Sequence, residues 1–325
     1  MRFPLELNVS LTKYLMSMKM KGVKRFPLVL MLEPLHLCNL SCSGCGRIRE
    51  YMTLEQCVHA IKECGAPVIT ICGGEPLLYP KIGELVEETL KLKRHIYLCT
   101  NALKLSESLK LFKPSPYLNL NVSIDGLEET QEKTRNRKGI YDIQVRAIAD
   151  AKAKGFRVIT NTTLYKETDV HEVEELFDRL TKLGVDGILV TPGFNYDAVE
   201  EDIFLDREAS LEKFRYIVKL ADRYRFFNTP LYMKFLSGER HLDCTPWGNV
   251  TVNPQGWKAP CYLITDRHYK TFREMMDDVA WDKYIKREDP RCKDCMLHSG
   301  VEPTAVQEVG KSLKDIIEII RWNLS

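Results

Sequence analysis

The 325-residue chain has little net charge and no long hydrophobic run. Lys and Arg total 47 against 45 Asp and Glu, so the formal charge of +2 is too balanced for a general nucleic-acid binder. The longest nearly uncharged apolar run, near residues 27–32, is far shorter than the roughly 20 residues that a membrane span needs. The first six residues lack the apolar stretch of a signal peptide. We therefore expect a cytoplasmic protein without a nucleic-acid partner.

Cysteine is absent from residues 100–243. Seven of the eleven cysteines lie within residues 38–99, and the other four lie within residues 244–295. The odd number and the uneven placement argue against the disulfide framework of a small secreted protein. In a reducing compartment, closely spaced cysteines indicate metal binding or chemistry. The sequence therefore predicts two thiolate clusters separated by a cysteine-free middle.

Strand-like and helix-like segments alternate through the first two thirds of the chain. The predicted strands are residues 28–33, 68–72, 95–99, 118–124, 157–163 and 187–191. The predicted helices are residues 53–64, 81–93, 141–154 and 170–183, with a further helix near 207–225. Such alternation is typical of an α/β fold with a parallel sheet and crossover helices. A complete eight-unit barrel needs about 250 residues, so six units predict an open, partial (β/α)6 barrel.

Three domains follow from this pattern. The barrel is predicted to span residues 28–227, and a Cys-rich α+β module to span residues 228–325. Residues 1–27 precede the barrel, and Leu11, Tyr14, Leu15 and Met18 follow helical spacing among several lysines. This segment is interpreted as a helix that caps the open barrel or as a basic amphipathic helix at an anionic membrane surface.

Cys38, Cys42 and Cys45 form a C-x3-C-x2-C motif directly after the first predicted strand. Parallel α/β folds place their chemistry at this carboxyl end of the strands. Three thiolates on one short loop can hold three corners of a 4Fe-4S cluster and leave the fourth iron open to substrate. A zinc site would need a fourth ligand, for which His36 is the local candidate. Three buried cysteines without a metal are the remaining alternative.

Gly73, Gly74, Glu75 and Pro76 follow the second predicted strand. Together with the C-x3-C-x2-C motif, this segment resembles the radical S-adenosylmethionine (SAM) superfamily. The resemblance implies a 4Fe-4S cluster whose open iron binds SAM, and a reduced cluster that cleaves SAM to a 5′-deoxyadenosyl radical. It further implies that Glu75 binds the SAM ammonium, while the glycines let the backbone approach a ligand.

Further polar residues end the later strands, where the same resemblance places SAM contacts. Turn chemistry or strand capping is the alternative for each of them. These candidates are Thr100, Asn101, Ser123, Asp125, Asn161 and Pro192.

Cys99 ends the third predicted strand and is expected close to the radical site. A thiol has a weak S–H bond and can give a hydrogen atom to a carbon radical. The alternative is a small, buried apolar residue without a chemical role.

Cys244, Cys261, Cys292 and Cys295 make up the second group. Four thiolates can close a structural zinc site or fully ligate a 4Fe-4S cluster. Their spacing resembles the auxiliary-cluster modules attached to many radical SAM enzymes. A second 4Fe-4S cluster, zinc, and partial or no metal binding are left open.

Several segments outside the superfamily motifs resemble the adenosylhopane synthase family. They are residues 27–34, 63–67, 97–103, 112–117, 244–249 and 260–263. That family adds the 5′-deoxyadenosyl radical to the alkene of the triterpene diploptene, in hopanoid lipid biosynthesis. The resemblance implies a diploptene-like substrate, an electron donor such as flavodoxin or ferredoxin, and peripheral contact with the inner membrane surface as an open alternative. Another isoprenoid, a peptide or a cofactor precursor is the alternative substrate.

A polycyclic hydrocarbon needs a large apolar pocket. Aromatic residues of the C-terminal module are candidates for building one, or for an ordinary core. They are Trp247, Trp257, Tyr262, Phe272 and Trp281. The chain departs from the adenosylhopane synthase pattern at Ser299, where that family is expected to have a cysteine.

Overall fold

The computed structural model describes residues 2–40, 50–194, 201–309 and 312–324. Its centre is one nine-stranded sheet with the strand order β6-β5-β4-β3-β2-β1-β7-β8-β9. The strands are β1 (Val29–Leu32), β2 (Val68–Ile71), β3 (His95–Thr100), β4 (Leu118–Ser123), β5 (Arg157–Leu164), β6 (Gly187–Pro192), β7 (Asn249–Asn253), β8 (Gly256–Pro260) and β9 (Thr265–Tyr269). The first six run parallel in chain order, as a partial (β/α)6 barrel requires.

The C-terminal module extends this sheet. Strand β7 pairs in parallel with β1, and β8 and β9 then add antiparallel strands. The fold class predicted from the sequence is therefore confirmed, and the module continues the barrel sheet through β7. The domain boundaries at residues 27 and 227 stay predictions.

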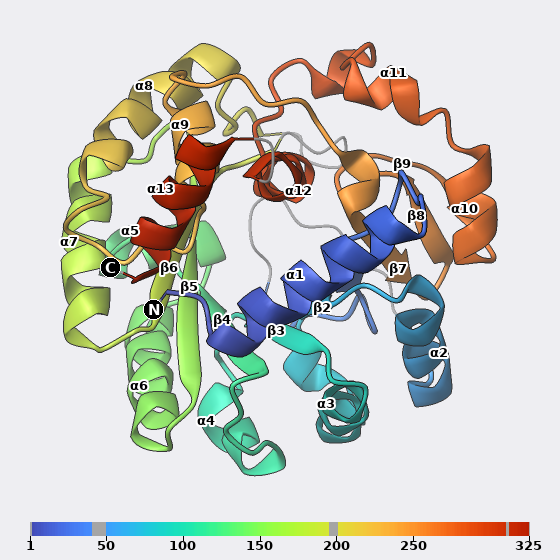
Figure 1. Ribbon diagram of the computed structural model, residues 1–325. Helices are drawn as coiled ribbons and strands as arrows, with labels where there is room; N and C mark the ends of the chain where they lie inside the picture. Colours follow the sequence, from blue (N-terminus) through green and yellow to red (C-terminus); the bar gives the residue numbers. More distant parts are fainter. Residues whose placement is uncertain (1, 41–49, 195–200, 310–311, 325) are drawn as a thin grey trace.

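Helices surround the strands on the outside of the curved sheet (Figure 1). Those that follow the barrel strands are α2 (Leu54–Cys64), α3 (Ile82–Lys91), α4 (Leu105–Ser108), α5 (Glu128–Arg135), α6 (Ile140–Ala153), α7 (Val170–Lys182) and α8 (Arg207–Lys219). The module adds α9 (Pro230–Leu236), α10 (Phe272–Asp278), α11 (Trp281–Ile285), α12 (His298–Val309) and α13 (Leu313–Leu324). Short 3₁₀ helices are η1 (Pro76–Leu78), η2 (Leu109–Leu111), η3 (Pro246–Gly248) and η4 (Pro290–Cys292). Helix α2 begins with a complete capping box between Thr53 and Gln56.

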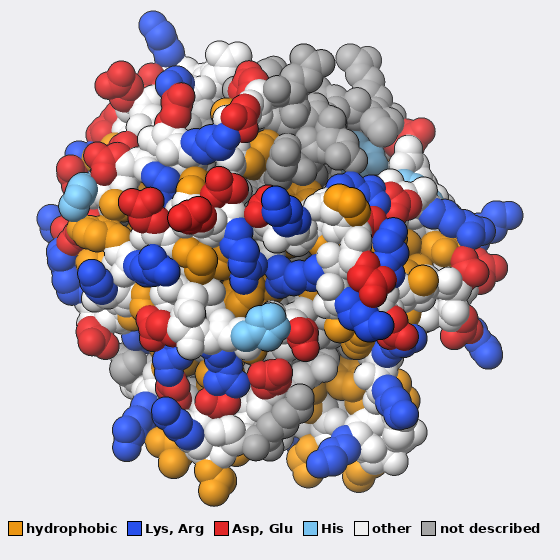
Figure 2. Space-filling view, turned by 90° about the horizontal axis from the view of Figure 1, so that it is seen from above, with side chains coloured by type: hydrophobic (Ala, Val, Ile, Leu, Met, Phe, Trp, Pro, Cys, Tyr) orange, Lys and Arg blue, Asp and Glu red, His pale blue; other side chains and the backbone are white. Residues whose placement is uncertain are grey.

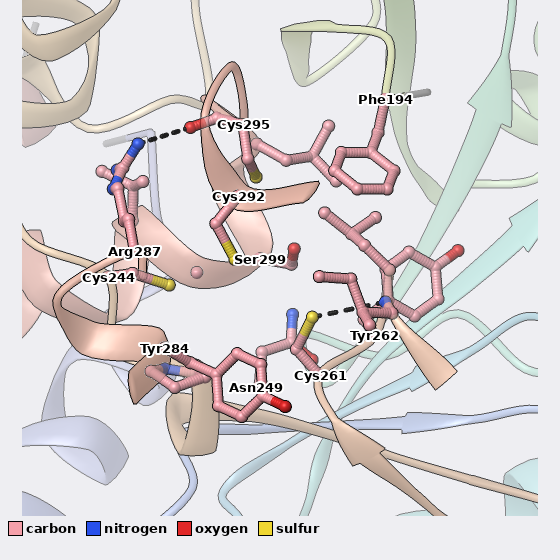
Figure 3. Close-up of a pocket in the computed structure, with 16 residues that line it drawn as sticks. Phe194, Cys244, Asn249, Cys261, Tyr262, Tyr284, Arg287, Cys292, Cys295 and Ser299 are labelled. Atoms are coloured by element: carbon pink, nitrogen blue, oxygen red, sulfur yellow. Dashed lines mark hydrogen bonds between the residues drawn. The ribbon is translucent and has the colours of Figure 1, made fainter. Parts of the chain in front are cut away.

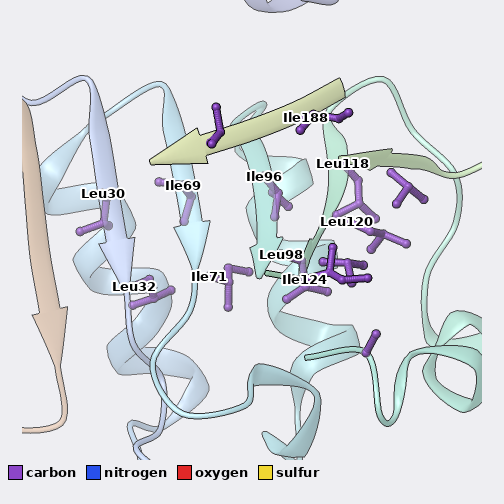
Figure 4. Packing of buried hydrophobic residues seen from close by; sticks show 14 of the residues in the cluster. Leu30, Leu32, Ile69, Ile71, Ile96, Leu98, Leu118, Leu120, Ile124 and Ile188 are labelled. Atoms are coloured by element: carbon purple, nitrogen blue, oxygen red, sulfur yellow. The ribbon is translucent and has the colours of Figure 1, made fainter. Parts of the chain in front are cut away.

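The two faces of the barrel strands differ in polarity. Leu30, Ile71, Ile96 and Leu120 belong to the apolar layer between the strands and the outer helices (Figure 4). Successive side chains of a strand point to opposite faces, so the residues between them line the barrel lumen. In β3 and β4 these lumen residues are His95, Tyr97, Cys99, Asn119, Asn121 and Ser123. The strands are therefore held by an apolar outer layer around a polar interior.

Helix α1 (Leu5–Met20) covers the end of the barrel at which the strands begin. The Tyr14 hydroxyl donates a hydrogen bond to the Pro27 carbonyl just before β1 (2.9 Å). The Arg2 amide donates to the Asn323 carbonyl of α13 (2.8 Å), so the described ends of the chain lie side by side (Figure 1). These contacts support the capping interpretation of the first segment.

Apolar side chains of α1 remain exposed, among them Val9, Met16 and Met20. Association of this helix with a membrane surface therefore stays a prediction. Among the described residues, no helix is long and apolar enough to cross a membrane. On the face shown in Figure 2, basic and acidic side chains are interspersed, in keeping with the small net charge.

Candidate functional site

The segment after β2 packs directly against the segment that leads to Cys38. The Gly74 amide donates to the Leu35 carbonyl (3.0 Å), and the Glu75 amide donates to the Leu37 carbonyl (2.9 Å). A Cβ atom on Gly73 would lie 2.4 Å from the Leu35 carbonyl oxygen, and one on Gly74 would lie 2.2 Å from that of Leu37. Both positions therefore need glycine, because the two backbones touch there.

Glu75 is 1% exposed and ties the ends of two strands together. One carboxylate oxygen accepts hydrogen bonds from the Thr100 hydroxyl (2.8 Å) and the Leu77 amide (3.0 Å). The other accepts from the Asn101 amide (2.8 Å). Burial raises the pKa of Glu75, while these donors oppose the rise. The predicted SAM ligand is thus held rigidly at the rim of the barrel.

Asn101 connects the end of β3 to the first cysteine of the motif. Its side-chain amide donates to the side-chain Oδ1 of Asn39 (2.8 Å) and lies 3.9 Å from the Cys38 sulfur. Cys42 and Cys45 lie outside the described residues. The structure therefore brings Cys38, residues 73–76, Thr100 and Asn101 to one corner of the barrel, as the sequence predicts for adjacent cluster and SAM sites.

Cys99 lies on the lumen face of β3, opposite Asn121 of β4. The Asn121 side-chain amide donates to the Cys99 sulfur (3.4 Å). Burial raises the pKa of the Cys99 thiol to about 12, so the sulfur carries its proton at neutral pH. Among the described residues, the buried Oδ1 of Asn121 has no hydrogen-bond partner, which leaves an acceptor beside the thiol.

Both carboxylate oxygens of Asp125 have partners within the protein. One accepts from the Thr163 amide (2.9 Å), and the other forms an ion pair with Arg135 (2.6 Å). The Ser123 carbonyl, two residues earlier at the end of β4, accepts from the side chain of Gln144 (2.9 Å). These bonds hold the ends of β4 and β5, so the strand-capping alternative describes the contacts of Asp125 better than direct SAM binding does.

A cavity of about 190 Å³ opens at the ends of β5 and β6. Asn161, Thr163 and Pro192 line it, so two of the predicted SAM contacts face a common space. The remaining lining residues are Tyr165, Thr191, Gly193, Phe194, Phe204, Tyr262, Leu297 and His298. The cavity is thus lined by aromatic side chains and by the polar side chains of Asn161 and Thr163.

His298, the first residue of α12, also lines this cavity. Burial lowers its pKa to about 4, so the ring is neutral at pH 7. Its Nδ1 is buried and has no partner among the described residues. The helical position of His298 depends on the fold of α12, and no local spacing in the sequence signals that it faces this cavity.

The four C-terminal cysteines come together although they are far apart in the sequence. Cys244, Cys261, Cys292 and Cys295 line one pocket, and their sulfur atoms point into its interior (Figure 3). Cys244 precedes η3, Cys261 follows β8, and the last two lie at η4 and the turn after it. Phe194, Tyr262 and Leu297 line both this pocket and the cavity beside β5 and β6. The two spaces are therefore neighbours.

The surroundings of Cys244 and Cys261 leave room for their thiols. A Cβ atom on Gly300 would lie 2.6 Å from the Cys244 sulfur, so only glycine leaves that thiol its place. The Ile264 amide donates to the Cys261 sulfur (3.4 Å). Burial raises the pKa of Cys261 to about 11 and that of Cys244 further. Such thiols keep their protons until a metal replaces them.

Comparison with known proteins agrees with this arrangement. The family model of the radical SAM superfamily matches residues 32–180, which begin at the last residue of β1 and contain β2 to β5 with the motifs at the strand ends. Residues 32–180 of this chain are thus similar to the radical SAM superfamily. A second family model, described as a domain of unknown function, matches residues 188–319. Radical SAM proteins use a 4Fe-4S cluster and SAM, and the contacts around Cys38 and residues 73–76 fit these two groups.

The curated relatives of this radical SAM protein carry out different reactions. The Fe-coproporphyrin III synthase of Methanosarcina barkeri is 27% identical over 183 residues, 52% of this chain and 46% of that protein. A GTP 3′,8-cyclase of Clostridium botulinum is 25% identical over 248 residues, 69% of this chain and 77% of that protein. This chain thus spans about half the length of the synthase.

One solved structure has a fold similar to that of this chain. The crystal structure of Streptococcus suis SuiB has a TM-score of 0.66 at 18% identity, and the match covers 86% of this chain and 70% of that one. This likeness concerns the fold alone. Neither SuiB nor the curated relatives above are adenosylhopane synthases, so that finer resemblance is not supported by these matches.

Most of the aromatic residues expected to line a hydrocarbon pocket belong to the core. Trp247 and Trp281 meet edge to face (5.9 Å between ring centroids), and Trp257 packs on Phe272 (5.1 Å). Tyr262 alone of the five lines the cavity beside β5 and β6. The core alternative for the other four is therefore the correct one.

Proposed function

We propose that this radical SAM enzyme holds its 4Fe-4S cluster on Cys38, Cys42 and Cys45 and binds SAM with residues 73–76 and Asn101. Cluster and SAM together supply a 5′-deoxyadenosyl radical when bound. The contact of Asn101 with both Cys38 and Glu75 supports this assignment, because it joins the cluster loop to the SAM rim. Asn161 and Pro192 extend the SAM site into the cavity beside β5 and β6. A small electron donor such as flavodoxin or ferredoxin supplies the reducing electron.

Cys244, Cys261, Cys292 and Cys295 hold a second 4Fe-4S cluster in this proposal. A tetrahedral zinc site with bonds near 2.3 Å places its sulfurs only about 3.8 Å apart. Among the described residues, no three Cys, His, Asp or Glu side chains converge as ligands of a single metal ion. All four thiols nevertheless line one pocket, so a larger group fits them better. Four cysteine ligands leave no iron open to substrate, which separates this cluster from the first.

Cys99 gives a hydrogen atom to the substrate radical. The observation that carries this role is its half-buried, protonated thiol on the lumen face of β3, one strand from Glu75 and Asn121. A thiolate would have no hydrogen atom to give. The orphan Oδ1 of Asn121 offers a hydrogen-bond acceptor that orients a polar group beside the sulfur.

The lumen favours a substrate with polar groups, such as a cofactor precursor or a peptide. Asn121 and Asn161 face the lumen and the cavity, and His298 presents a neutral imidazole there. The names of the two curated relatives, a coproporphyrin synthase and a GTP cyclase, also indicate polar molecules. Adenosylation of diploptene is the second candidate, favoured by Cys99, because a radical addition to an alkene ends with capture of a hydrogen atom.

The test is an anaerobic incubation of the reconstituted enzyme with SAM, a reductant and either diploptene or a panel of polar precursors, followed by mass spectrometry. We expect 5′-deoxyadenosine from the wild type, and a polar precursor that is converted. Cys99→Ala should still cleave SAM but should lose or alter the final product. Unchanged product yield and stereochemistry in Cys99→Ala would remove Cys99 from the mechanism, and an adenosylated triterpene would replace the polar substrate by diploptene.

A further inference from the structure

A second thiol lies directly beside Cys99. Strands β2 and β3 pair in parallel with Ile71 opposite Leu98 at the end of β2. Continued by one residue, this register sets Cys72 opposite Cys99, whose charge contributes to the raised pKa of Cys72. Ile71 and Leu98 pack in the outer apolar layer. Side chains alternate along a strand, so both thiols face the lumen. Cys72 is 7% exposed and stands apart from that outer layer.

The spacing of the two residues allows a disulfide. Paired strands lie about 4.8 Å apart, and the Cα atoms of disulfide-bonded cysteines are about 4.4–6.8 Å apart. Both cysteines are free thiols in the structure. Burial raises the pKa of Cys72 as well as that of Cys99, so both sulfurs keep their hydrogen atoms at neutral pH.

A proton acceptor stands on the other side of Cys72. Leu32 is opposite Ile71 in the β1–β2 pair, which places Glu33 opposite Cys72. The Glu33 carboxylate is buried, with the Lys258 ammonium 3.9 Å away, and its charge contributes to the raised pKa of Cys72. The ends of β1, β2 and β3 thus present a carboxylate, a thiol and a second thiol in a row.

We propose that Cys72 and Cys99 form a redox-active dithiol at the SAM site, in which Cys72 quenches the thiyl radical left on Cys99 by closing a disulfide. This inference rests on the proposed role of Cys99 as the hydrogen-atom donor. The Cys99 S–H bond breaks as a C–H bond forms on the substrate radical. The sulfur of Cys72 then bonds to the sulfur of Cys99, and the proton of the Cys72 thiol passes to Glu33.

The electron released by disulfide formation passes to the oxidised iron–sulfur cluster, which SAM cleavage has left one electron short. The pair thus loses two electrons per turnover, one with the hydrogen atom given to the product and one to the cluster. A dithiol reductant then returns the disulfide to two thiols. Each turnover therefore ends with a reduced cluster and an oxidised pair.

The first arm of the test needs neither SAM nor substrate. The holoenzyme is oxidised with diamide, its remaining thiols are alkylated, and tryptic peptides are mapped by mass spectrometry. We expect a disulfide between the peptides of residues 63–81 and 95–104, which carry Cys72 and Cys99. Cys64 shares the first peptide, so Cys64→Ala is the control and should keep the link, while Cys72→Ser should lose it. If the wild type does not form this disulfide, Cys72 and Cys99 are not a redox-active pair.

The second arm follows turnover. The holoenzyme is reduced, freed of reductant and mixed with one equivalent of SAM and no substrate, so that a single adenosyl radical takes the hydrogen atom of Cys99. We expect one Cys72–Cys99 disulfide for each 5′-deoxyadenosine, and no link in Cys72→Ser. 5′-Deoxyadenosine without the disulfide would overturn this inference and leave the proposed function standing. No 5′-deoxyadenosine would overturn the proposed function, and the diamide arm would still decide whether the thiols pair.

Discussion

The two thiol sites of this protein are built in opposite ways. The first takes its cysteines from one loop after β1, and its first cysteine is held by Asn101 from the end of β3. The second gathers Cys244, Cys261, Cys292 and Cys295 from separate parts of the C-terminal module. A site on one loop can leave a metal corner open, whereas four converging thiols close the coordination. In the proposed function, the barrel therefore holds the reactive cluster and the module holds an enclosed one.

The largest effect should come from breaking the first site alone. Cys38→Ala removes one of three ligands, so 5′-deoxyadenosine formation should fall to background, while the second cluster keeps about four iron atoms. Cys57→Ala, on the buried face of α2 in the outer apolar layer, is the control and should keep full activity. The measurements are product chromatography and iron content. SAM cleavage in Cys38→Ala would contradict the assignment.

A substitution that leaves all four cysteines in place should still disrupt the second site. In Gly300→Ala, the added Cβ would lie 2.6 Å from the Cys244 sulfur, so the thiol must move out of the pocket. We expect iron to fall from about eight to about four atoms per chain, the count of one cubane cluster. Gly83→Ala in α3 has room for its Cβ, 3.4 Å from Leu111, and is the matched control. Full iron content in Gly300→Ala would argue against a cluster bound by Cys244.

The ion pair between Arg135 and Asp125, near the first site, should contribute to the stability of the fold. Arg135→Met leaves the buried carboxylate of Asp125 without its ion-pair partner, which should lower the free energy of unfolding by about 3 kcal/mol. The exposed pair of Arg273 and Asp277 is the contrast, and Arg273→Met should change stability by about 0.5 kcal/mol or less. Denaturant unfolding measures both. Equal effects of the two substitutions would remove the structural role of Asp125.

The smallest expected effect is a pH dependence in the module. Burial raises the pKa of Glu302 to about 7, while the Thr229 amide and hydroxyl donate to its carboxylate. The folded state therefore keeps a proton that the unfolded state releases near pH 4.5. Stability from this group is full below pH 4.5 and is lost as the pH rises through about 7. Thermal unfolding of Glu302→Gln should show a flatter profile between these pH values, and an unchanged slope would contradict the assignment.

The sequence predicted the barrel well because hydrophobic alternation marks its strands. All six predicted strands match β1 to β6 within two residues at each end. Strands β7 to β9 were missed, since short, mixed segments such as Asn249–Asn253 gain their strand form only by pairing with β1. The same limit applies to the sites. Spacing within one loop predicted Cys38, whereas the pairing of Cys72 with Cys99 and the placement of His298 depend on register and helix packing.

The most direct test of two differently built sites is anaerobic iron analysis combined with electron paramagnetic resonance of the reduced protein, with and without SAM. Two 4Fe-4S clusters predict about eight iron atoms per chain. SAM should change the signal of one cluster, and that signal should be missing in Cys38→Ala. A spectrum that SAM leaves unchanged, or about four iron atoms accompanied by zinc, would contradict the account.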